Sequence, residues 1–318
     1  MFTDFPNGVT SFGVPLVGGL PLTMTGRYIF VNPSTGLDGN DGLSVDTPKQ
    51  TVASAYAMAT TNKDDVIVLS TYANHELTEE LEISKSRVHF VGDVYGRMYG
   101  QRAKVNYTDG IATADKFAVK NTGVGNTFQG IKFLNNNTDS TVVATVGEGG
   151  EYAQYVNCEF YNSTNLTSDT VAEMVLNGDS TQFYGCTFGS LADAVSGDKV
   201  RPAILLTKGT VGTGLVCRDV YFDKCRFWKQ AGGTTTAFIK GGATDVERVM
   251  ELHDCQFVAN VLGAVPAVAI DVATLTVGQI ILTGDTCAFE CTKIATATGV
   301  ISGLATKVAT ATIGIQTT

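Results

Sequence analysis

The chain has 318 residues, 44% of them hydrophobic and only 17% charged, which is enough apolar material for a packed core and excludes a largely disordered protein. Its formal net charge of −9 argues against nucleic acid as a partner, because a surface that binds phosphates is basic. Seven cysteines without a CxxC pair favour a reducing compartment over a disulfide framework.

Residues 1–26 are apolar, nearly uncharged and interrupted by glycines and prolines. Disordered tails are usually polar, so we expect this segment to lie on the rest of the chain or on a partner. It lacks the basic and apolar regions of a secretory signal peptide. We interpret it as an N-terminal anchoring arm, with a set of candidate contact residues: Phe2, Phe5, Pro6, Asn7, Phe12, Val14 and Leu16.

The next segment, residues 28–70, reads as strand, long turn, helix and strand. The helix is predicted near residues 47–60, with Asp46 or Thr47 as its N-cap and Pro48 in its first turn. One face of this helix is apolar and consists of Val52, Ala55, Tyr56 and Ala59. The stretch "DVIVLS" that follows resumes a strand.

The turn before the helix contains "DGNDG" at residues 38–42. Its carboxylates suggest oxygen ligands for a cation, but the spacing of an EF-hand loop and its closing glutamate are missing. A turn built from Gly and Asx residues is the first interpretation, and cation binding is the alternative.

A cysteine followed two residues later by a phenylalanine recurs through the second half of the chain. The five copies are Cys158 and Phe160, Cys186 and Phe188, Cys225 and Phe227, Cys255 and Phe257, and Cys287 and Phe289. Ile131 and Phe133 occupy the same two positions upstream. The residue three before the cysteine position is aromatic or Leu in five of the six copies, and Gly284 is the exception.

Residues two apart in a strand point to the same face, so each pair is predicted to point into a core. A repeat unit of about thirty residues that is made of short strands must stack on neighbouring units to bury its apolar face. The pattern predicts coils of a right-handed parallel β-helix in which the cysteines form an inner column. Core packing is the preferred role of these cysteines, with metal binding and redox chemistry as alternatives. One long interval predicts an excursion near residues 192–202.

The run from Val31 to Ala55 resembles the N-terminal entry of pectin-lyase-like right-handed parallel β-helix proteins. The matching residues, in order, are Val31, Gly36, Asp38, Asn40, Asp41, Gly42, Ser44, Pro48, Thr51 and Ala55. "DVIVLSTY" follows at residues 65–72, with Thr71 where the family usually has glycine. The resemblance implies an all-β, single-stranded parallel β-helix over residues 27–292, with residues 293–318 closing it or pairing with another subunit.

Near the start, "FPNGVT" is similar to the N-terminal segment of several tailed-phage virion proteins, which attach to the particle through that end. This resemblance implies a virion protein, assembled in the host cytoplasm and bound to the major capsid protein or another virion protein. A capsid decoration or head-fibre role is expected, and a homotrimer with it. A tailspike-type polysaccharide depolymerase or lyase is an alternative.

No catalytic residue, metal ion or cofactor is predicted. The carboxylates that lie near repeat strands are Asp219, Asp223, Glu251 and Asp254, and solvated or turn-forming roles are their first interpretation. A glycan-binding module is a further alternative, with Trp228, Tyr161 and Tyr95 as its platform. The apolar run at residues 261–282 contains Gly, Pro and Asp, so it is interpreted as strands and no membrane partner is expected.

Overall fold

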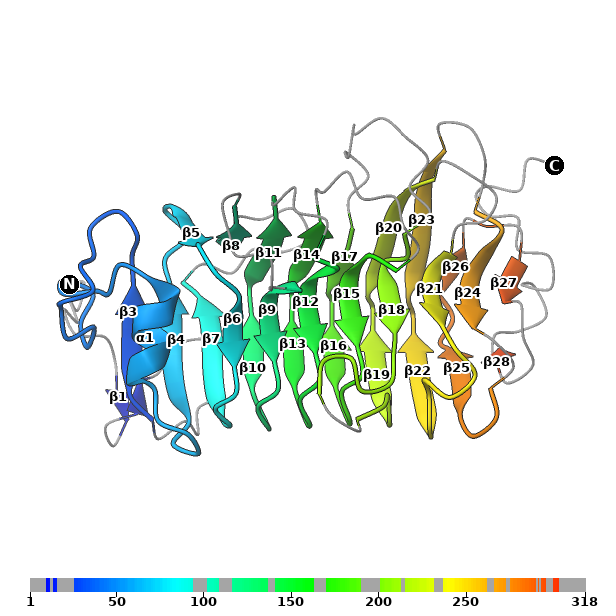
Figure 1. The fold of residues 1–318 in the computed structure, drawn as a ribbon, viewed down its shortest axis with the longest axis horizontal. Helices are drawn as coiled ribbons and strands as arrows, with labels where there is room; N and C mark the ends of the chain where they lie inside the picture. Colours follow the sequence, from blue (N-terminus) through cyan, green and yellow to red (C-terminus); the bar gives the residue numbers. More distant parts are fainter. Residues whose placement is uncertain are drawn as a thin grey trace, which may run out of the picture.

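A computed structural model describes most of the chain. The described residues are 10–11, 14–15, 26–93, 102–108, 116–136, 141–162, 170–189, 201–212, 215–231, 237–261, 266–272, 275–289, 291, 293–295 and 300–302. Within them the chain is all-β apart from one helix, and its strands form three parallel sheets and one short antiparallel pair. The predicted parallel β-helix is therefore confirmed (Figure 1).

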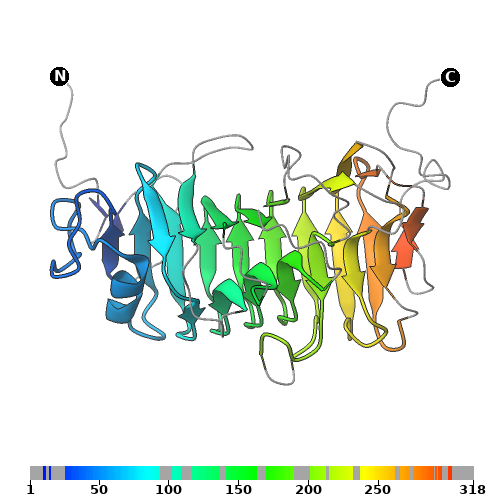
Figure 2. The same cartoon turned by 45° about the horizontal axis from the view of Figure 1, so that its top comes forward.

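The three sheets run side by side along the length of the molecule (Figures 1 and 2). The first sheet contains β3 (Tyr28–Val31), β4 (Asp65–Leu69), β7 (Val88–Gly92), β10 (Thr127–Gln129), β13 (Gln154–Val156), β16 (Gln182–Tyr184), β19 (Val220–Asp223), β22 (Val249–His253), β25 (Gln279–Thr283) and β28 (Val300–Ser302). The second contains β5 (Asn74–Leu77), β8 (Ala103–Tyr107), β11 (Ile131–Asn135), β14 (Glu159–Asn162), β17 (Thr187–Phe188), β20 (Arg226–Ala231), β23 (Gln256–Val261) and β26 (Ala288–Phe289). The third contains β6 (Leu81–Ile83), β9 (Phe117–Asn121), β12 (Ala144–Glu148), β15 (Ala172–Leu176), β18 (Ile204–Leu206), β21 (Ala237–Gly241), β24 (Val268–Val272) and β27 (Lys293–Ala295).

Each coil passes through the first, second and third sheets in turn and then returns to the first. The corner between the first and second sheets is short, and a residue with left-handed backbone follows the first-sheet strand. The residues at this corner are Gly130, Asn157, Gly185, Lys224, Asp254 and Gly284, with φ between 50° and 88°. Glycine, Asn and Asp adopt this conformation more readily than other residues. The repeated corner gives successive coils the same offset, so equivalent residues stack.

Two inner columns of aromatic rings fill the cylinder. In the second sheet, Phe133, Phe160, Phe188, Phe227, Phe257 and Phe289 pair strand by strand, with ring centroids 4.7–5.5 Å apart. In the first sheet, Phe90, Phe128, Tyr155, Phe183 and Phe222 stack at 4.6–5.3 Å. The two columns meet edge to face, as at Phe183 and Phe188, whose centroids are 5.5 Å apart. Offset stacking and edge contacts are both favourable ring geometries.

The column in the first sheet does not continue to Gly284, where the sequence alignment placed it. Leu252 pairs instead with Leu282, which is fully buried. Four residues separate β25 from β26, whereas two separate β22 from β23, and this longer corner shifts the alignment by two positions.

The cysteines lie between the two aromatic columns. Cys158, Cys186, Cys225 and Cys255 are fully buried, and Cys287 is half-buried. Burial raises the pKa of the Cys225 thiol well above its usual range, so it stays protonated. Its Sγ lies 3.5 Å from the carbonyl oxygen of Phe183. All seven cysteines are unpaired thiols.

The single helix in the described part of the chain, α1 (Val52–Met58), covers the first coil (Figure 1). It begins later than predicted, because Thr51 is its N-cap and accepts a hydrogen bond from the amide of Ser54 at 3.1 Å. Thr47 and Lys49 are not available to the helix, since Thr47 bonds Asp41 within the preceding turn and the amide of Lys49 donates to Phe30 O of β3. Tertiary contacts therefore overrode the local capping preference of Asp46 and Thr47.

Three sequence predictions fall partly outside the described residues. Val14 lies in the short strand β2 (Val14–Pro15), which pairs with β1 (Thr10–Ser11), and the other predicted arm contacts are outside. Nearly all of the predicted excursion at 192–202 is outside as well. Within residues 293–318, β27 and β28 continue the third and first sheets. No helix among the described residues is long and apolar enough to cross a membrane.

Candidate attachment surface at the first coil

The turn at residues 32–50 closes the outer edge of β3. The amide of Phe30 donates to Gly42 O at 2.8 Å, and the amide of Lys49 donates to Phe30 O at 2.8 Å. The amide of Asn32 donates in turn to Lys49 O at 2.9 Å. The first strand of the sheet is therefore paired with its own turn, which protects an edge that would otherwise be open.

Two carboxylates hold this turn and the start of the helix. Asp38 accepts from the amides of Gln50 and Thr51 at 3.0 and 2.8 Å, and from the Thr51 hydroxyl at 2.9 Å. Burial raises the pKa of Asp38, but these hydrogen bonds outweigh it and lower the pKa. Asp41 accepts from the Thr47 hydroxyl at 2.6 Å. "DGNDG" thus forms the turn that was its first interpretation, and no group of three metal-ligating side chains occurs in the described ranges.

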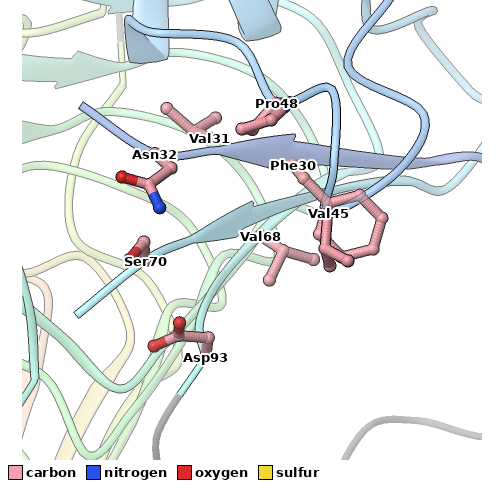
Figure 3. A pocket seen from close by; sticks show the side chains of 8 residues that line it. All are labelled: Phe30, Val31, Asn32, Val45, Pro48, Val68, Ser70 and Asp93. Atoms are coloured by element: carbon pink, nitrogen blue, oxygen red, sulfur yellow. The ribbon is translucent and has the colours of Figure 1, made fainter. Parts of the chain in front are cut away.

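A cavity of about 150 Å³ opens beside this turn, on the outside of the first sheet (Figure 3). Its lining is mostly apolar with three polar side chains: Phe30, Val31, Val45, Pro48, Val68, Asn32, Ser70 and Asp93. The polar groups are held in place, since Asp93 accepts from the Thr71 amide at 2.9 Å and Asn32 Oδ1 from the Ser34 amide at 3.0 Å. A mostly apolar hollow with fixed polar groups is typical of a binding site.

Large apolar side chains are exposed around this cavity. Leu37, Leu43, Val45 and Tyr72 are 62%, 48%, 69% and 81% exposed. Leu37 is tied to the cavity wall, because its amide donates to Pro48 O at 3.2 Å, and Tyr72 is tied to Ser70 Oγ at the same distance. Single exposed apolar residues are ordinary, whereas a cluster marks an interaction surface. We call these four side chains and the cavity the attachment surface.

The sequence contained a signal for this surface that we did not use. In "YIFV" and "DVIVL", apolar residues occupy both faces of the strand, and strands covered on both faces read as continuous apolar runs. Ile29 and Ile67 point inward and are fully buried, so Phe30 and Val68 point outward. Val66 and Val91 form a small buried cluster on that outer face, against which Val68 packs.

The four candidate carboxylates do not form one site. Asp223 and Glu251 lie on neighbouring strands of the first sheet, but Asp223 pairs with His253 and Glu251 with Tyr221. Asp219 precedes β19 and lies 2.8 Å from Arg248, while Asp254 follows β22 and accepts from the Thr286 amide at 3.0 Å. Asp254 has the turn-forming role first assigned to it, whereas Asp219 forms an ion pair and Glu251 accepts from the Thr283 hydroxyl at 2.8 Å.

Two of the three predicted platform aromatics share one face. Tyr161 and Trp228 lie on the outer face of the second sheet, two coils apart. Tyr95 lies outside the described residues.

The sequence matches no protein-family model and no curated protein. Among solved structures, the fold is similar to pectate lyase Pel9A, with a TM-score of 0.56 and 13% identity over 81% of this chain. This chain spans 62% of the length of that protein. It is also similar to the pectin methylesterase from Aspergillus niger, with a TM-score of 0.52 and 12% identity over 87% of this chain and 84% of the other.

These two likenesses show a shared fold, that of the pectin-lyase-like right-handed parallel β-helix proteins. A looser likeness to the Dettilon tailspike protein has a TM-score of 0.42 and 16% identity, over 80% of this chain and 49% of the other. It is too distant to carry an argument about function.

Proposed function

We propose that this chain is a structural protein of a tailed-bacteriophage particle, with a capsid decoration or head-fibre role. It is held at its N-terminal end on the major capsid protein or on another virion protein. The observation that carries this proposal is the attachment surface, which lies in the first coil and includes Phe30 of β3, the strand that directly follows the apolar segment 1–26. The resemblance of "FPNGVT" to virion anchoring segments supports the same end of the molecule.

One interface at this end would involve two apolar features together. Leu37, Leu43, Val45 and Tyr72 expose apolar area, and residues 1–26 are apolar and nearly uncharged. Burying apolar area contributes roughly 25 cal/mol per Å², so a partner that covers both features gains from each. The hydrogen bonds of Asp38 and Asp41 hold the turn that carries Leu37, Leu43 and Val45, which lowers the ordering cost of binding through these side chains.

We propose a homotrimer, in which the outer face of the first sheet contacts the other subunits. The ten strands of this sheet contain neither Lys nor Arg, and its outward side chains in the central coils are uncharged: Thr127, Gln129, Gln154, Val156, Gln182 and Tyr184. Subunit interfaces are depleted of charged residues at their centre, which supports this face over the more charged second sheet.

Attachment is tested with particles assembled without this protein, from the phage genome that carries its gene. We expect the full chain to bind them, and both a chain lacking residues 1–25 and the variant Val45→Asp/Tyr72→Asp to bind at least tenfold more weakly, a loss of about 1.4 kcal/mol. Val277→Asp is the matched control, because Val277 is 63% exposed but far from the first coil. Unchanged binding by the truncated chain and the double variant would overturn the proposal.

The trimer is tested by light scattering. We expect a mass of three times 33.5 kDa for the natural chain. Gln154→Lys/Gln182→Lys places like charges on neighbouring strands of the proposed interface and should yield monomers. A natural chain that is monomeric, or a double variant that stays trimeric, would contradict the assignment of this face.

A further inference from the structure

The outer face of the second sheet combines cations with aromatic rings. We call this the basic–aromatic strip and define it by Arg102, Lys104, Lys132, Tyr161, Arg226 and Trp228. Strand pairing aligns Lys104, Lys132, Glu159, Thr187 and Arg226 in one outward column. Tyr161 and Trp228 project from the same strands two residues further on. The strip is a basic surface on a chain whose net charge is −9.

A single carboxylate is shared by two cations in the strip. Lys132 Nζ lies 2.7 Å from Glu159 Oε1, and Arg102 Nη1 lies 3.0 Å from Glu159 Oε2. Lys104, on the strand next to Lys132, is exposed. The cations of the strip therefore outnumber its single carboxylate, and Glu159 cannot accept from all N–H groups of Arg102, Lys104 and Lys132.

Arg102 gives an independent indication of an anionic ligand. Its side chain is only 3% exposed, and its Nε donates to Asn157 O at 2.8 Å. Its Nη2 is buried and has no hydrogen-bond partner in the structure. Buried guanidinium N–H groups are nearly always paired, because an unpaired one loses its hydrogen bond to water without a replacement. This group therefore keeps a hydrogen-bonding capacity that neither Asn157 nor Glu159 uses.

The aromatic members of the strip are spaced along the cylinder axis. Tyr161 follows Phe160 and Trp228 follows Phe227, so two strand spacings of about 4.8 Å separate them. The strand between them ends at Phe188, and Gly189 follows with φ +90°. A Cβ on Gly189 would lie 2.0 Å from the Trp228 carbonyl oxygen, so this position requires glycine and contributes no side chain between the two rings. Lys132 Nζ lies 5.5 Å from the centre of the Tyr161 ring, which joins the basic and aromatic parts.

We propose that the basic–aromatic strip binds an acidic oligosaccharide. Carboxylate or sulfate groups of the glycan pair with Arg102, Lys104 and Lys132, since guanidinium and ammonium groups form charge-assisted hydrogen bonds with such anions. Sugar rings pack their C–H faces on Tyr161 and Trp228, which supply apolar surface at small entropic cost. This activity would be a surface adhesion function that does not depend on how the chain is attached at its N-terminal end.

Single-stranded nucleic acid also uses cations and stacked rings. The observations favour the glycan, because only a few cations are present on a strongly acidic chain, whereas phosphate backbones require many. A single-stranded oligonucleotide is therefore included among the probes of the binding test.

The test measures binding of the full chain by calorimetry at low and high salt. The probes are hyaluronan oligosaccharides, a heparin oligosaccharide, a neutral cello-oligosaccharide and a single-stranded oligonucleotide. We expect salt-sensitive binding of an acidic oligosaccharide, with the neutral one at least tenfold weaker, which is about 1.4 kcal/mol. No binding of either acidic probe, or tighter binding of the oligonucleotide, would overturn the proposal.

Variants then locate the site. Lys132→Gln and Tyr161→Ala should each weaken binding about tenfold, and Lys132→Arg should retain it. Lys120→Gln is the matched charge control, because Lys120 forms a 2.9 Å ion pair with Glu82 on the third sheet. Tyr152→Ala is the ring control, because Tyr152 is 64% exposed and lies in no strand of the second sheet. Thermal unfolding verifies that each variant is folded, and equal losses in the variants and their controls would place the binding elsewhere.

Discussion

The inside and the outside of the cylinder are built by different rules. Inward positions repeat the same residue type from coil to coil, as in the phenylalanine column that includes Phe160, Phe188 and Phe227. Outward positions change at every step, and the neighbours of those phenylalanines are Glu159, Thr187 and Arg226. The inner repeat specifies the fold, because every coil must present the same shape to the next. The outer variation carries what distinguishes this protein from others with the same fold.

The largest loss of stability is expected when one ring is removed from an inner column. Phe188 is fully buried and stacks on Phe160 and Phe227 at 4.8 and 5.1 Å. We expect Phe188→Ala to reduce the free energy of unfolding by about 3–5 kcal/mol, through lost burial and the cavity left behind. Tyr152→Ala, at an outer position where the ring is 64% exposed, should cost less than about 1 kcal/mol. Equal losses of unfolding free energy in the two variants, measured by urea denaturation, would contradict the difference between inner and outer positions.

A second test uses Glu148, an acid at an inner position of the third sheet. Glu148 is fully buried, and its carboxylate accepts from Tyr155 Oη at 2.5 Å, Gly150 N at 2.6 Å and Asn121 Nδ2 at 2.9 Å. Burial raises the pKa of Glu148 from 4.5 to about 7, although these hydrogen bonds oppose the shift.

Because the folded pKa lies above the unfolded one, the protonated acid favours the folded state. Its contribution is fully present below pH 4.5 and is lost as the pH rises to about 7, by roughly 3 kcal/mol. Glu148→Gln should remove this slope while keeping a similar shape. This prediction is checked by measuring the unfolding free energy of both proteins between pH 4 and 8. The same pH dependence in the variant would show that Glu148 is not its source.

The smallest expected effect lies at the corner between the first and second sheets. Lys224 has φ 51°, a conformation that costs a lysine about 1 kcal/mol, and Gly185 holds the equivalent position one coil earlier. We expect Lys224→Gly to stabilise the protein by about 0.5–1 kcal/mol. Gly185→Ala should destabilise it, since its Cβ would lie 2.9 Å from Asn157 Oδ1. The two melting temperatures should therefore move in opposite directions.

The inner columns explain why the fold could be predicted from the sequence. Cys225 and Phe227 recur with equivalents in other coils, and such a repeat remains visible when everything between the copies varies. The errors arose where spacing changed or where a distant segment intervened. Gly284 was misaligned because the last corner is two residues longer, and the start of α1 was misplaced because the Thr47 and Lys49 region is bound to β3.

The outer sites were harder to predict because they combine residues from different coils. Lys132 and Glu159 each follow a cysteine-position residue, so the repeat already implied that they are neighbours. Arg102 reaches Glu159 across 57 positions and lies outside the repeated motif, so nothing in the sequence pointed to it. The attachment cavity likewise needs Val45, from a turn whose path depends on hydrogen bonds to β3.

The uniform stacking of coils also means that the number of coils determines the length of the cylinder. Ten strands of the first sheet define nine steps of about 4.8 Å each, or about 43 Å from the first coil to the last. Inserting or deleting one coil would change this length by a single step while leaving both ends intact. The height at which the far end stands above whatever holds the first coil is therefore set by how many coils the gene encodes, and it can be altered without redesigning either end.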